Sequence, residues 1–530
     1  MMSGGDRSAS GEAGVSDRMN RRTMFDISKG WKVWRGELAN GQDPGLNDSD
    51  WRLVDLPLDC SIEDLPDRNS PFSATDSGGG PATGWTVGGE FWYRRTIDLR
   101  PSEAEKVLVR IGGAYMNADV WLNGVHLAAH PYGYTPIDID CGSAWRAGGP
   151  NILAVRVRNH GANSRWYSGT GLFRRVTARM VGKNHVPADG LFLWTESVAR
   201  DVAVVRGTLE IVGEPCQATL RLFDERGNSV ASHCVLPGGK HKVEFALTVL
   251  DPRLWSPDAP SLYQAVVELD GTEAVRTSFG IRTVRVDPDL GLLINGSAVK
   301  LKGGCLHHDL GILGAAAFDS AEDRRVRLLR EAGYNAIRTA HNPPSEEFLE
   351  ACDRRGMLVL DEAFDEWHLH KTADSYAASF EEWCERDLTA YVRRDRNHPC
   401  VIMWSIGNEI PDSFDRPDTA LRLRECALLS DSTRPITAGI CPPWWPTTTW
   451  VDWEKSSDSA FLHLDSCGYN YIWQHYESDR ARHPERTIMG TESYPAEAFE
   501  NWSLVEKYPW VLGDFVWTAM DYIGESGIGQ

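Results

Sequence analysis

The chain has 530 residues, with 55 basic and 75 acidic side chains and a formal net charge of −20. That length is more than one ordinary core needs and predicts roughly two to four domains. The acidic balance disfavours nucleic acid as a partner, and no apolar run is long enough to span a membrane. We therefore expect a soluble multidomain protein with no nucleic acid and no membrane partner.

Residues 1–23 consist of Gly, Ser and charged residues without an apolar stretch. They cannot form the hydrophobic part of a secretory signal, so we expect a disordered tail and a cytoplasmic location. The 11 cysteines include no CxxC pair, and the two closest, Cys426 and Cys441, are 15 positions apart. This spacing indicates reduced thiols and argues against a zinc site.

From residue 24 to 181 the chain reads as short strands separated by turns, which is typical of a β-sandwich. Asn123-Gly124 follows one of these strands and predicts a hairpin, because both residue types tolerate positive φ. Residues 182–286 show a second β pattern with strict alternation. The segments ATLRLFD and VEFALTV predict strands with one buried face, as in an immunoglobulin-like sandwich.

After Asp287 eight short apolar runs alternate with amphipathic helical segments, which predicts a parallel (β/α)8 barrel over residues 287–530. In chain order the runs are KLKGGCL, AIRTA, MLVLDEAF, VIMWSIGN, ITAGI, SCGYNY, TIMGTES and DFVWTAM. Ser320 is expected to cap one helix, and Ser345 and Gly356 are expected to bound the next. Little sequence follows the eighth apolar run, DFVWTAM. We therefore expect the last barrel helix to be missing and the chain to be truncated at its C-terminal end.

Active sites of such barrels lie at the C-terminal ends of the strands. The polar and aromatic residues that close the eight runs are therefore the candidates for function. They are His307, His308, Asp309, Arg338, His341, Asn342, Asp361, Glu362, Asn408, Glu409, Tyr469, Tyr471, Glu492, Trp517 and Asp521.

Glu409 and Glu492 close the fourth and seventh runs. A buried carboxylate at an apolar strand end is costly unless it has a use. Two carboxyl groups facing one gap are what cleavage of a glycosidic bond requires, one as acid and the other as nucleophile. The alternative is that either glutamate is a structural ion-pair partner of an arginine.

A resemblance to glycoside hydrolase family 2 rests on many ordered motifs from Phe25 to the end of the chain. They are GWKVW, DSDWRLVDLP, FWYRR, ADVWLNG, HPYGYTPIDID, NHGANSRWYSGTGLFRRV, LHHDLG, NAIRTAHNPP, LVLDEAFDEW, SIGNEI, GTESYP and DFVWTAMDY. The resemblance implies a jelly-roll-like, sugar-binding-type sandwich over 24–181. It also implies a retaining, exo-acting β-glycosidase.

The resemblance also implies individual roles. Glu409 matches the acid/base, Glu492 the nucleophile, and Asn408 the amide that contacts the sugar 2-hydroxyl. The other residues matched to substrate contacts are His341, Trp517 as the floor under the sugar, His307, Asp309, Arg165 and Trp166. Tyr471 is the choice for the tyrosine that binds the nucleophile, with Tyr469 as the alternative. Apart from the resemblance, Arg338 is expected to neutralise carboxylates in the pocket, with Asp361 and Glu362 as its structural braces. Asn342 is a further supporting residue.

No metal or other cofactor is expected to take part, because DEAFDEWHLH departs from the metal-binding pattern of the best known bacterial β-galactosidases. The motifs most resemble the β-galactosidase branch, so a β-galactoside is the expected substrate. A β-glucuronidase, a β-mannosidase and a carbohydrate-binding protein inactivated by truncation remain alternatives. A homo-oligomer stays open.

Overall fold

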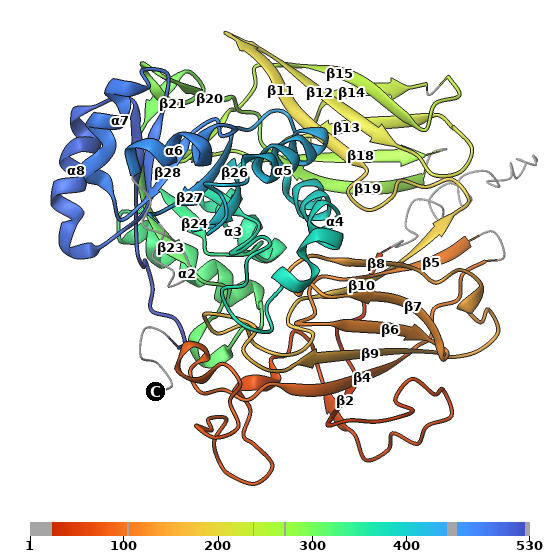
Figure 1. The fold of residues 1–530 in the computed structure, drawn as a ribbon. Helices are drawn as coiled ribbons and strands as arrows, with labels where there is room; N and C mark the ends of the chain where they lie inside the picture. The colour runs from red at the N-terminus through yellow and green to blue at the C-terminus, as the bar shows by residue number, and fades with distance from the viewer. Residues whose placement is uncertain (1–23, 103–104, 237, 270–271, 443–452, 525–530) are drawn as a thin grey trace, which may run out of the picture.

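The computed structural model describes residues 24–102, 105–236, 238–269, 272–442 and 453–524. Two β-sandwiches lie beside a closed barrel of eight parallel strands (Figure 1). This arrangement confirms the multidomain fold class of sandwiches followed by a barrel. The tail expected for residues 1–23 lies outside the described residues.

The first sandwich has a six-stranded and a four-stranded antiparallel sheet. The larger sheet has the order β3-β2-β4-β9-β6-β7, with bounds Arg52–Val54, Trp31–Arg35, Gly89–Ile97, Asn151–Asn159, Ala118–Leu122 and Val125–His130. The smaller has the order β1-β10-β5-β8, with bounds Met24–Asp26, Val176–Gly182, Glu105–Ile111 and Ile137–Asp140. Asn123 and Gly124 join β6 to β7 with φ values of 53° and 84°, which confirms the predicted hairpin.

The second sandwich packs a three-stranded sheet against a four-stranded one around a single apolar core. The first has the order β11-β12-β15, with bounds Leu191–Ala199, Val202–Glu210 and Lys242–Leu250. The second has the order β14-β13-β18-β19, with bounds Ser229–Val235, Ala218–Phe223, Tyr263–Leu269 and Thr272–Phe279. Side chains of β15 alternate between exposed and buried along its whole length, as the alternating sequence predicts.

Two small antiparallel sheets precede the barrel. Their strands are β16 (Trp255–Ser256), β17 (Ala259–Pro260), β20 (Val284–Asp287), β21 (Gly291–Ile294) and β22 (Ser297–Val299). The barrel strands β23 to β30 follow, with bounds Leu301–Leu306, Ala336–Thr339, Leu358–Glu362, Val401–Asn408, Ile436–Ile440, Cys467–Asn470, Ile488–Ser493 and Val511–Val516. Seven of the eight predicted apolar runs contain one of these strands in full, whereas the eighth, DFVWTAM, begins at Asp514 and overlaps only the second half of β30.

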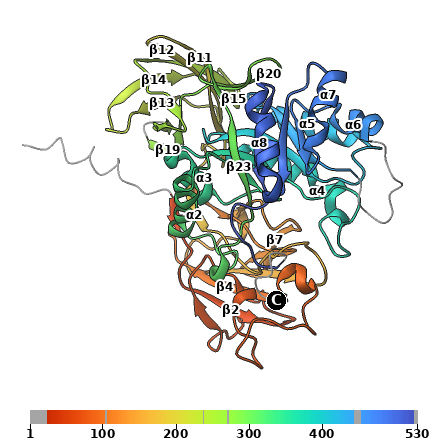
Figure 2. The ribbon, with the colours of Figure 1, turned by 90° about the vertical axis from the view of Figure 1, so that its left-hand side faces the viewer.

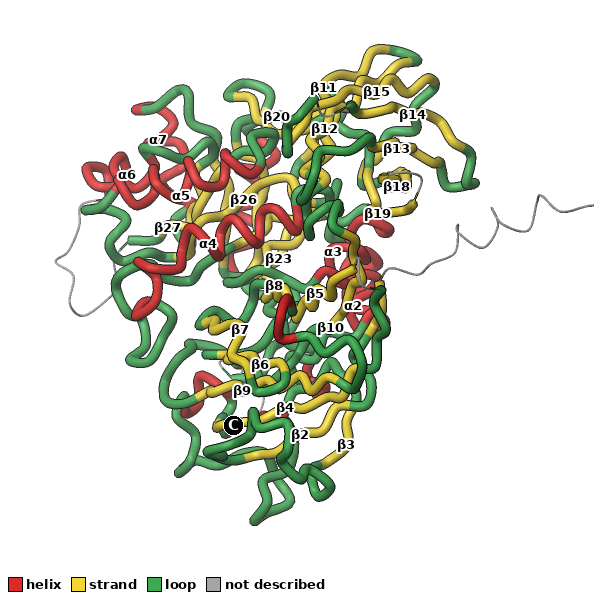
Figure 3. The backbone as a smooth tube through the Cα atoms, turned by 90° about the vertical axis from the view of Figure 1, so that its right-hand side faces the viewer, coloured by secondary structure: helices red, strands yellow, loops and turns green. Residues whose placement is uncertain are grey.

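Seven helices surround the barrel in the described part of the chain, each between two consecutive strands (Figure 1). Figure 3 shows most of them, in red, on the outside of the barrel strands. The seven helices are α2 (Asp319–Glu331), α3 (Glu346–Arg355), α4 (Ala377–Asp395), α5 (Pro417–Ser430), α6 (Trp453–Phe461), α7 (Tyr476–Arg482) and α8 (Ala498–Lys507). None of them is long and apolar enough to cross a membrane.

Helices α2 and α3 test the capping predictions. Ser345 caps α3 and accepts a hydrogen bond from Phe348 N, and Gly356 ends it with φ 67°, as predicted. The prediction for α2 is wrong, because the helix begins one residue earlier, at Asp319, and Ser320 lies inside its first turn. The residue before α2 is Phe318, whose side chain makes no capping hydrogen bond.

No helix follows β30 in the chain described up to Gly524. Instead the segment after β30 runs toward the first sandwich (Figure 2). Gly524 has φ +105°, and a Cβ there would lie 2.1 Å from the carbonyl oxygen of Ala82. Glycine is thus required where this segment meets the sandwich.

Charged side chains join the sandwiches to the barrel. Arg174 of the first sandwich donates to the carbonyl of Pro343 at 2.6 Å, and Arg282, which follows the second sandwich, donates to the carbonyl of Val401 at 2.7 Å. Both arginines are buried. Such bonds satisfy carbonyls that would otherwise be buried without partners, so they fix the sandwiches against the barrel.

Candidate active site

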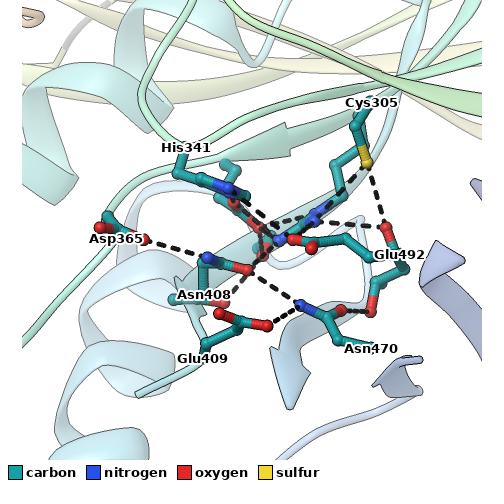
Figure 4. A network of polar contacts seen from close by, with 12 residues as sticks. Cys305, His341, Asp365, Asn408, Glu409, Asn470 and Glu492 are labelled. Carbon is teal, nitrogen blue, oxygen red and sulfur yellow. Dashed lines mark hydrogen bonds and ion pairs between the residues drawn. The ribbon is translucent and has the colours of Figure 1, made fainter. Parts of the chain in front are cut away.

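Glu409 and Glu492 belong to one network of polar contacts at the C-terminal end of the barrel (Figure 4). Glu409 directly follows β26, and Glu492 is the penultimate residue of β29. Both side chains are buried, with 7% and 4% of their surface exposed. The structure therefore brings together the two carboxylates that the sequence singled out from different strands.

The guanidinium of Arg338, on β24, joins much of this network and is completely buried. It donates to Glu492 Oε1 at 2.7 Å, to Glu362 Oε2 at 2.7 Å and to Asn408 Oδ1 at 2.7 Å. Its fork-shaped set of donors suits this task, because one buried cation then serves two carboxylates and one amide. A Cβ on Gly439 would lie 2.8 Å from this guanidinium, so the neighbouring strand needs a glycine there.

The acid/base candidate Glu409 is held differently. Asn470 donates to Glu409 Oε1 at 3.3 Å and to Asn408 Oδ1 at 3.2 Å, while Thr491 fixes the amide of Asn470 by donating to its oxygen at 2.6 Å. The backbone of Glu409 has φ 45°, a conformation that an L-residue rarely adopts. Its amide donates to the carbonyl of Gly439 at 2.7 Å.

Glu492 receives two strong donors. Burial and the charge of Glu409 raise its pKa to about 7, against the opposing effects of Arg338 and of a hydrogen bond from Tyr471. Two carboxyl groups that repel each other in this way retain one proton between them near neutral pH. A cation and a hydroxyl donate to Glu492, whereas Glu409 accepts from a neutral amide, so the two carboxyl groups have unequal environments.

His341 lies beside the carboxylates, with its Nε2 atom 3.7 Å from Glu492 Oε1. Burial and the charge of Arg338 hold its pKa well below the ordinary range, so the ring is neutral. Nδ1 is 2.7 Å from Glu362 Oε1 and must carry the proton, because a carboxylate only accepts. Nε2 is therefore an acceptor toward the site, and the ring stacks on Trp517 at 5.1 Å with 4° between the planes.

His307 and Asp309 follow β23, and each has buried polar atoms without a hydrogen-bond partner among the described residues. Neither ring nitrogen of His307, nor Oδ1 of Asp309, bonds to any described residue. Burial lowers the pKa of His307 and raises that of Asp309 to about 6. Native proteins rarely leave such atoms unpaired, and His307 contacts Trp166 and Trp517, so its nitrogens are available to a ligand.

His308 has a different environment from its neighbour. Its Nε2 atom is 3.1 Å from the carbonyl of Ser168, and its ring packs against Tyr134 and Phe173. Burial lowers its pKa to about 3. It is a neutral wall residue between the first sandwich and the barrel.

The first sandwich contributes Arg165 and Trp166, which line a cavity together with His341. Arg165 donates to Asp365 with Nε at 3.0 Å and Nη2 at 2.7 Å. Asp365 in turn accepts from Asn408 Nδ2 at 3.0 Å. The sandwich is therefore connected to the residue that precedes Glu409.

The chain is similar to known proteins in sequence and in structure. The family model described as “Glycosyl hydrolases family 2, TIM barrel domain” matches residues 284–523. A second family model, described as “Glycosyl hydrolases family 2”, matches residues 212–282. The β-galactosidase BoGH2A of Bacteroides ovatus is 34% identical over 97% of this chain and 69% of its own length. The chain belongs to glycosyl hydrolase family 2.

Other members of the family are similar over most of the chain. A family 2 structure from Bacteroides cellulosilyticus superposes with a TM-score of 0.90 at 42% identity, covering 95% of this chain and 66% of its own. A β-glycosidase of Bacteroides vulgatus has a TM-score of 0.84 at 28% identity, covering 95% and 71%. A β-glucuronidase of Paenibacillus borealis is 26% identical over 83% of each chain. The chain thus spans about two thirds of the length of several relatives.

Three predicted residues lie elsewhere than at the carboxylates. The hydroxyl of Tyr469 donates to Asp479 at 2.8 Å rather than to Glu492. Asn342 Nδ2 donates to the carbonyl of Pro343 at 3.3 Å. The expectation that Asp361 braces Arg338 is wrong, because successive strand residues face opposite sides and only Glu362 points inward.

Sequence reasoning missed Asn470, Asp365 and Lys371. Asn470 is the last residue of β28 and could have been found by the rule applied to the other strand ends. Asp365 and Lys371 lie in the loop after β25, where no periodic pattern indicates which side chains turn inward. Lys371 donates to Asp365 Oδ1 and to the carbonyl of Asn408, both at 2.8 Å.

One group of described residues has the donors of a metal site within 4.8 Å of one another: Asp353, His398 and Cys400. His398 and Cys400 lie just before β26, at the opposite end of that strand from Glu409, and Asp353 lies on α3. There His398 Nδ1 and Asp353 Oδ2 are 2.6 Å apart, and Asp353 Oδ1 accepts from Cys400 N. An ion pair accounts for this group.

We expect Arg338→Met to lower the free energy of unfolding by about 3–5 kcal/mol at pH 8, because it leaves two buried carboxylates uncompensated. The loss should be smaller at pH 6, where the carboxylates can take up protons. Urea unfolding at both pH values measures it. The control is Arg355→Met, whose pair with Asp323 is about one third exposed and should cost less than about 1 kcal/mol. Equal effects of the two substitutions would contradict the role given to Arg338.

Proposed function

We propose that this chain carries the catalytic site of a retaining, exo-acting β-glycosidase, with Glu409 as acid/base and Glu492 as nucleophile. The observation that carries the proposal is the unequal environment of two buried carboxylates in one network. Arg338 and Tyr471 donate to Glu492, and neutral Asn470 donates to Glu409. Opposite protonation states are what the double-displacement mechanism needs.

In the first step Glu492 attacks the anomeric carbon while Glu409 gives its proton to the leaving oxygen. The bond to the leaving group breaks, and a covalent glycosyl-enzyme forms on Glu492. In the second step Glu409 removes a proton from water, and that water displaces Glu492 from the same face that the leaving group left. Two inversions give net retention of configuration.

The surrounding residues have matching roles in this proposal. Asn408, held by Arg338 and Asp365, presents its amide to the sugar 2-hydroxyl. His341 accepts from a hydroxyl through Nε2, and Trp517 forms the floor under the sugar ring. His307 and Asp309 bind further hydroxyls with the atoms that have no partner among the described residues.

A β-galactoside is the proposed substrate. The relative with 34% identity is named a β-galactosidase, while others are named β-glucuronidases. The cations near the cavity also favour a neutral sugar: Arg165 and Lys371 both bind Asp365, and Arg338 binds Glu362 and Glu492. A sugar carboxylate would have to compete with these ion pairs.

A 2-fluoro β-galactoside inactivator should label the peptide that contains Glu492, because the glycosyl-enzyme it forms hydrolyses very slowly. Mass spectrometry of a digest identifies the labelled residue. Azide should rescue Glu492→Ala as the inverted glycosyl azide and Glu409→Ala as the retained one. Label on Glu409, or the opposite azide configurations, would reverse the roles.

A panel of chromogenic β-glycosides tests the sugar. We expect the β-galactoside to have the highest kcat/KM, and at least about 100-fold more than the β-glucuronide, because a buried, paired cation binds carboxylate poorly. Turnover of the glucuronide or mannoside alone would refute the galactoside proposal. Binding without turnover, unchanged in Glu492→Gln, would identify a carbohydrate-binding protein instead.

The value of kcat/KM should decrease as the pH is lowered below about 7, because Glu492 must be ionised to attack and its pKa is raised to about 7. In Tyr471→Phe this acidic limb of the pH profile should move to higher pH by about 0.5–1 unit, because a hydrogen-bond donor that favours the ionised form of Glu492 is lost. The control is Tyr494→Phe, which keeps the ring stacked on Tyr471 at 4.4 Å. A profile flat down to pH 5 would contradict this assignment.

A further inference from the structure

Asp365 lies in the loop after β25, at the boundary between the first sandwich and the barrel. It lines a cavity of about 40 Å³ together with Arg165, Trp166, Lys371 and His341. His341 places this cavity next to the catalytic pair, because its Nε2 atom is 3.7 Å from Glu492. The proposed mechanism uses Asp365 only as a support for Asn408.

The two carboxylate oxygens of Asp365 accept different numbers of hydrogen bonds. Oδ1 accepts from Arg165 Nη2 at 2.7 Å, Lys371 Nζ at 2.8 Å and Asn408 Nδ2 at 3.0 Å. Oδ2 accepts from Arg165 Nε at 3.0 Å. A carboxylate oxygen has two lone pairs, so Oδ1 is saturated and Oδ2 has room for one more donor.

Neighbouring cations keep the carboxyl group of Asp365 ionised. Burial alone would raise its pKa, but the charges of Arg165 and Lys371 hold the pKa well below its ordinary range. The group is therefore an acceptor throughout the neutral pH range. A hydroxyl can donate to it, whereas the carboxylate of a uronic acid would bring a like charge into a buried space.

We propose that Asp365 is a specificity-determining residue, whose Oδ2 accepts a hydrogen bond from the 6-hydroxyl of the terminal sugar and thereby selects neutral β-glycosides over β-glucuronides, in which a carboxylate replaces that hydroxyl group. This inference rests on the proposed function. It assigns the choice of sugar class to the barrel loop after β25 and to its ion pair with the first sandwich. The alternative is that the ion pair only holds the two domains together.

The experiment compares the wild type with Asp365→Asn on the neutral β-glycoside that the wild type prefers and on the matching β-glucuronide. We expect kcat/KM for the neutral substrate to fall about 100-fold and the preference over the glucuronide to fall at least about tenfold. The matched control is Glu366→Gln, the adjacent buried acid, which accepts from the backbone of Lys371. It should leave the preference unchanged.

Monodeoxy substrates at C3, C4 and C6 separate recognition from domain attachment. The 6-deoxy substrate should lose about 100-fold in kcat/KM with the wild type but little with Asp365→Asn, because the same hydrogen bond is absent in both cases. The 3-deoxy and 4-deoxy substrates are controls, and additive losses for the 6-deoxy substrate would overturn the inference. So would a wild type that loses less than about tenfold with the 6-deoxy substrate, a measurement that needs no variant.

If the single variant does not fold, the double variant Asp365→Asn/Lys371→Met replaces it in the experiment. The double variant removes one charge of each sign, so the net charge of the loop is unchanged. It should show the same loss of preference, and an unchanged preference would overturn the inference. Failure of the proposed function gives a different result, because the wild type would then hydrolyse none of the glycosides and take no 2-fluoro label.

Discussion

The buried guanidinium of Arg338 is the interaction on which the site depends. A cation with no solvent contact requires compensation, and here Glu362 and Glu492 supply it. Because the guanidinium is rigid and planar, its bonds to these carboxylates and to Asn408 also fix where each lies. Charge balance and the positioning of the proposed catalytic groups are therefore the same constraint.

That constraint extends outward through Asn408. Its oxygen accepts from Arg338, and its amide nitrogen donates to Asp365, which pairs with Arg165 of the first sandwich. The chain of contacts runs from the centre of the barrel to a different domain without a gap. The first sandwich is thereby part of the site, and its loop supplies Arg165 and Trp166 to the same cavity as His341.

The barrel and its neighbours could be predicted because local patterns are strong there. Alternation in β15, the Asn123-Gly124 turn and the Ser345 and Gly356 caps each follow from the conformations that these residue types favour. Ser320 failed as a cap because a serine can equally lie within the first turn of a helix. Asp361 failed as a brace because a strand-end rule does not state which face a residue occupies.

The sequence by itself determined the order of the domains, the eight strands and the two glutamates, since periodicity and strand-end position depend on short stretches of chain. Only the tertiary structure decided which charged and polar side chains pair with one another. Tyr469 turned toward Asp479, and Asp365 joined Arg165 from 200 positions away in the sequence. Such pairings follow from the packing of separate segments, and burial then fixes them because an unpaired charge in the interior is too costly.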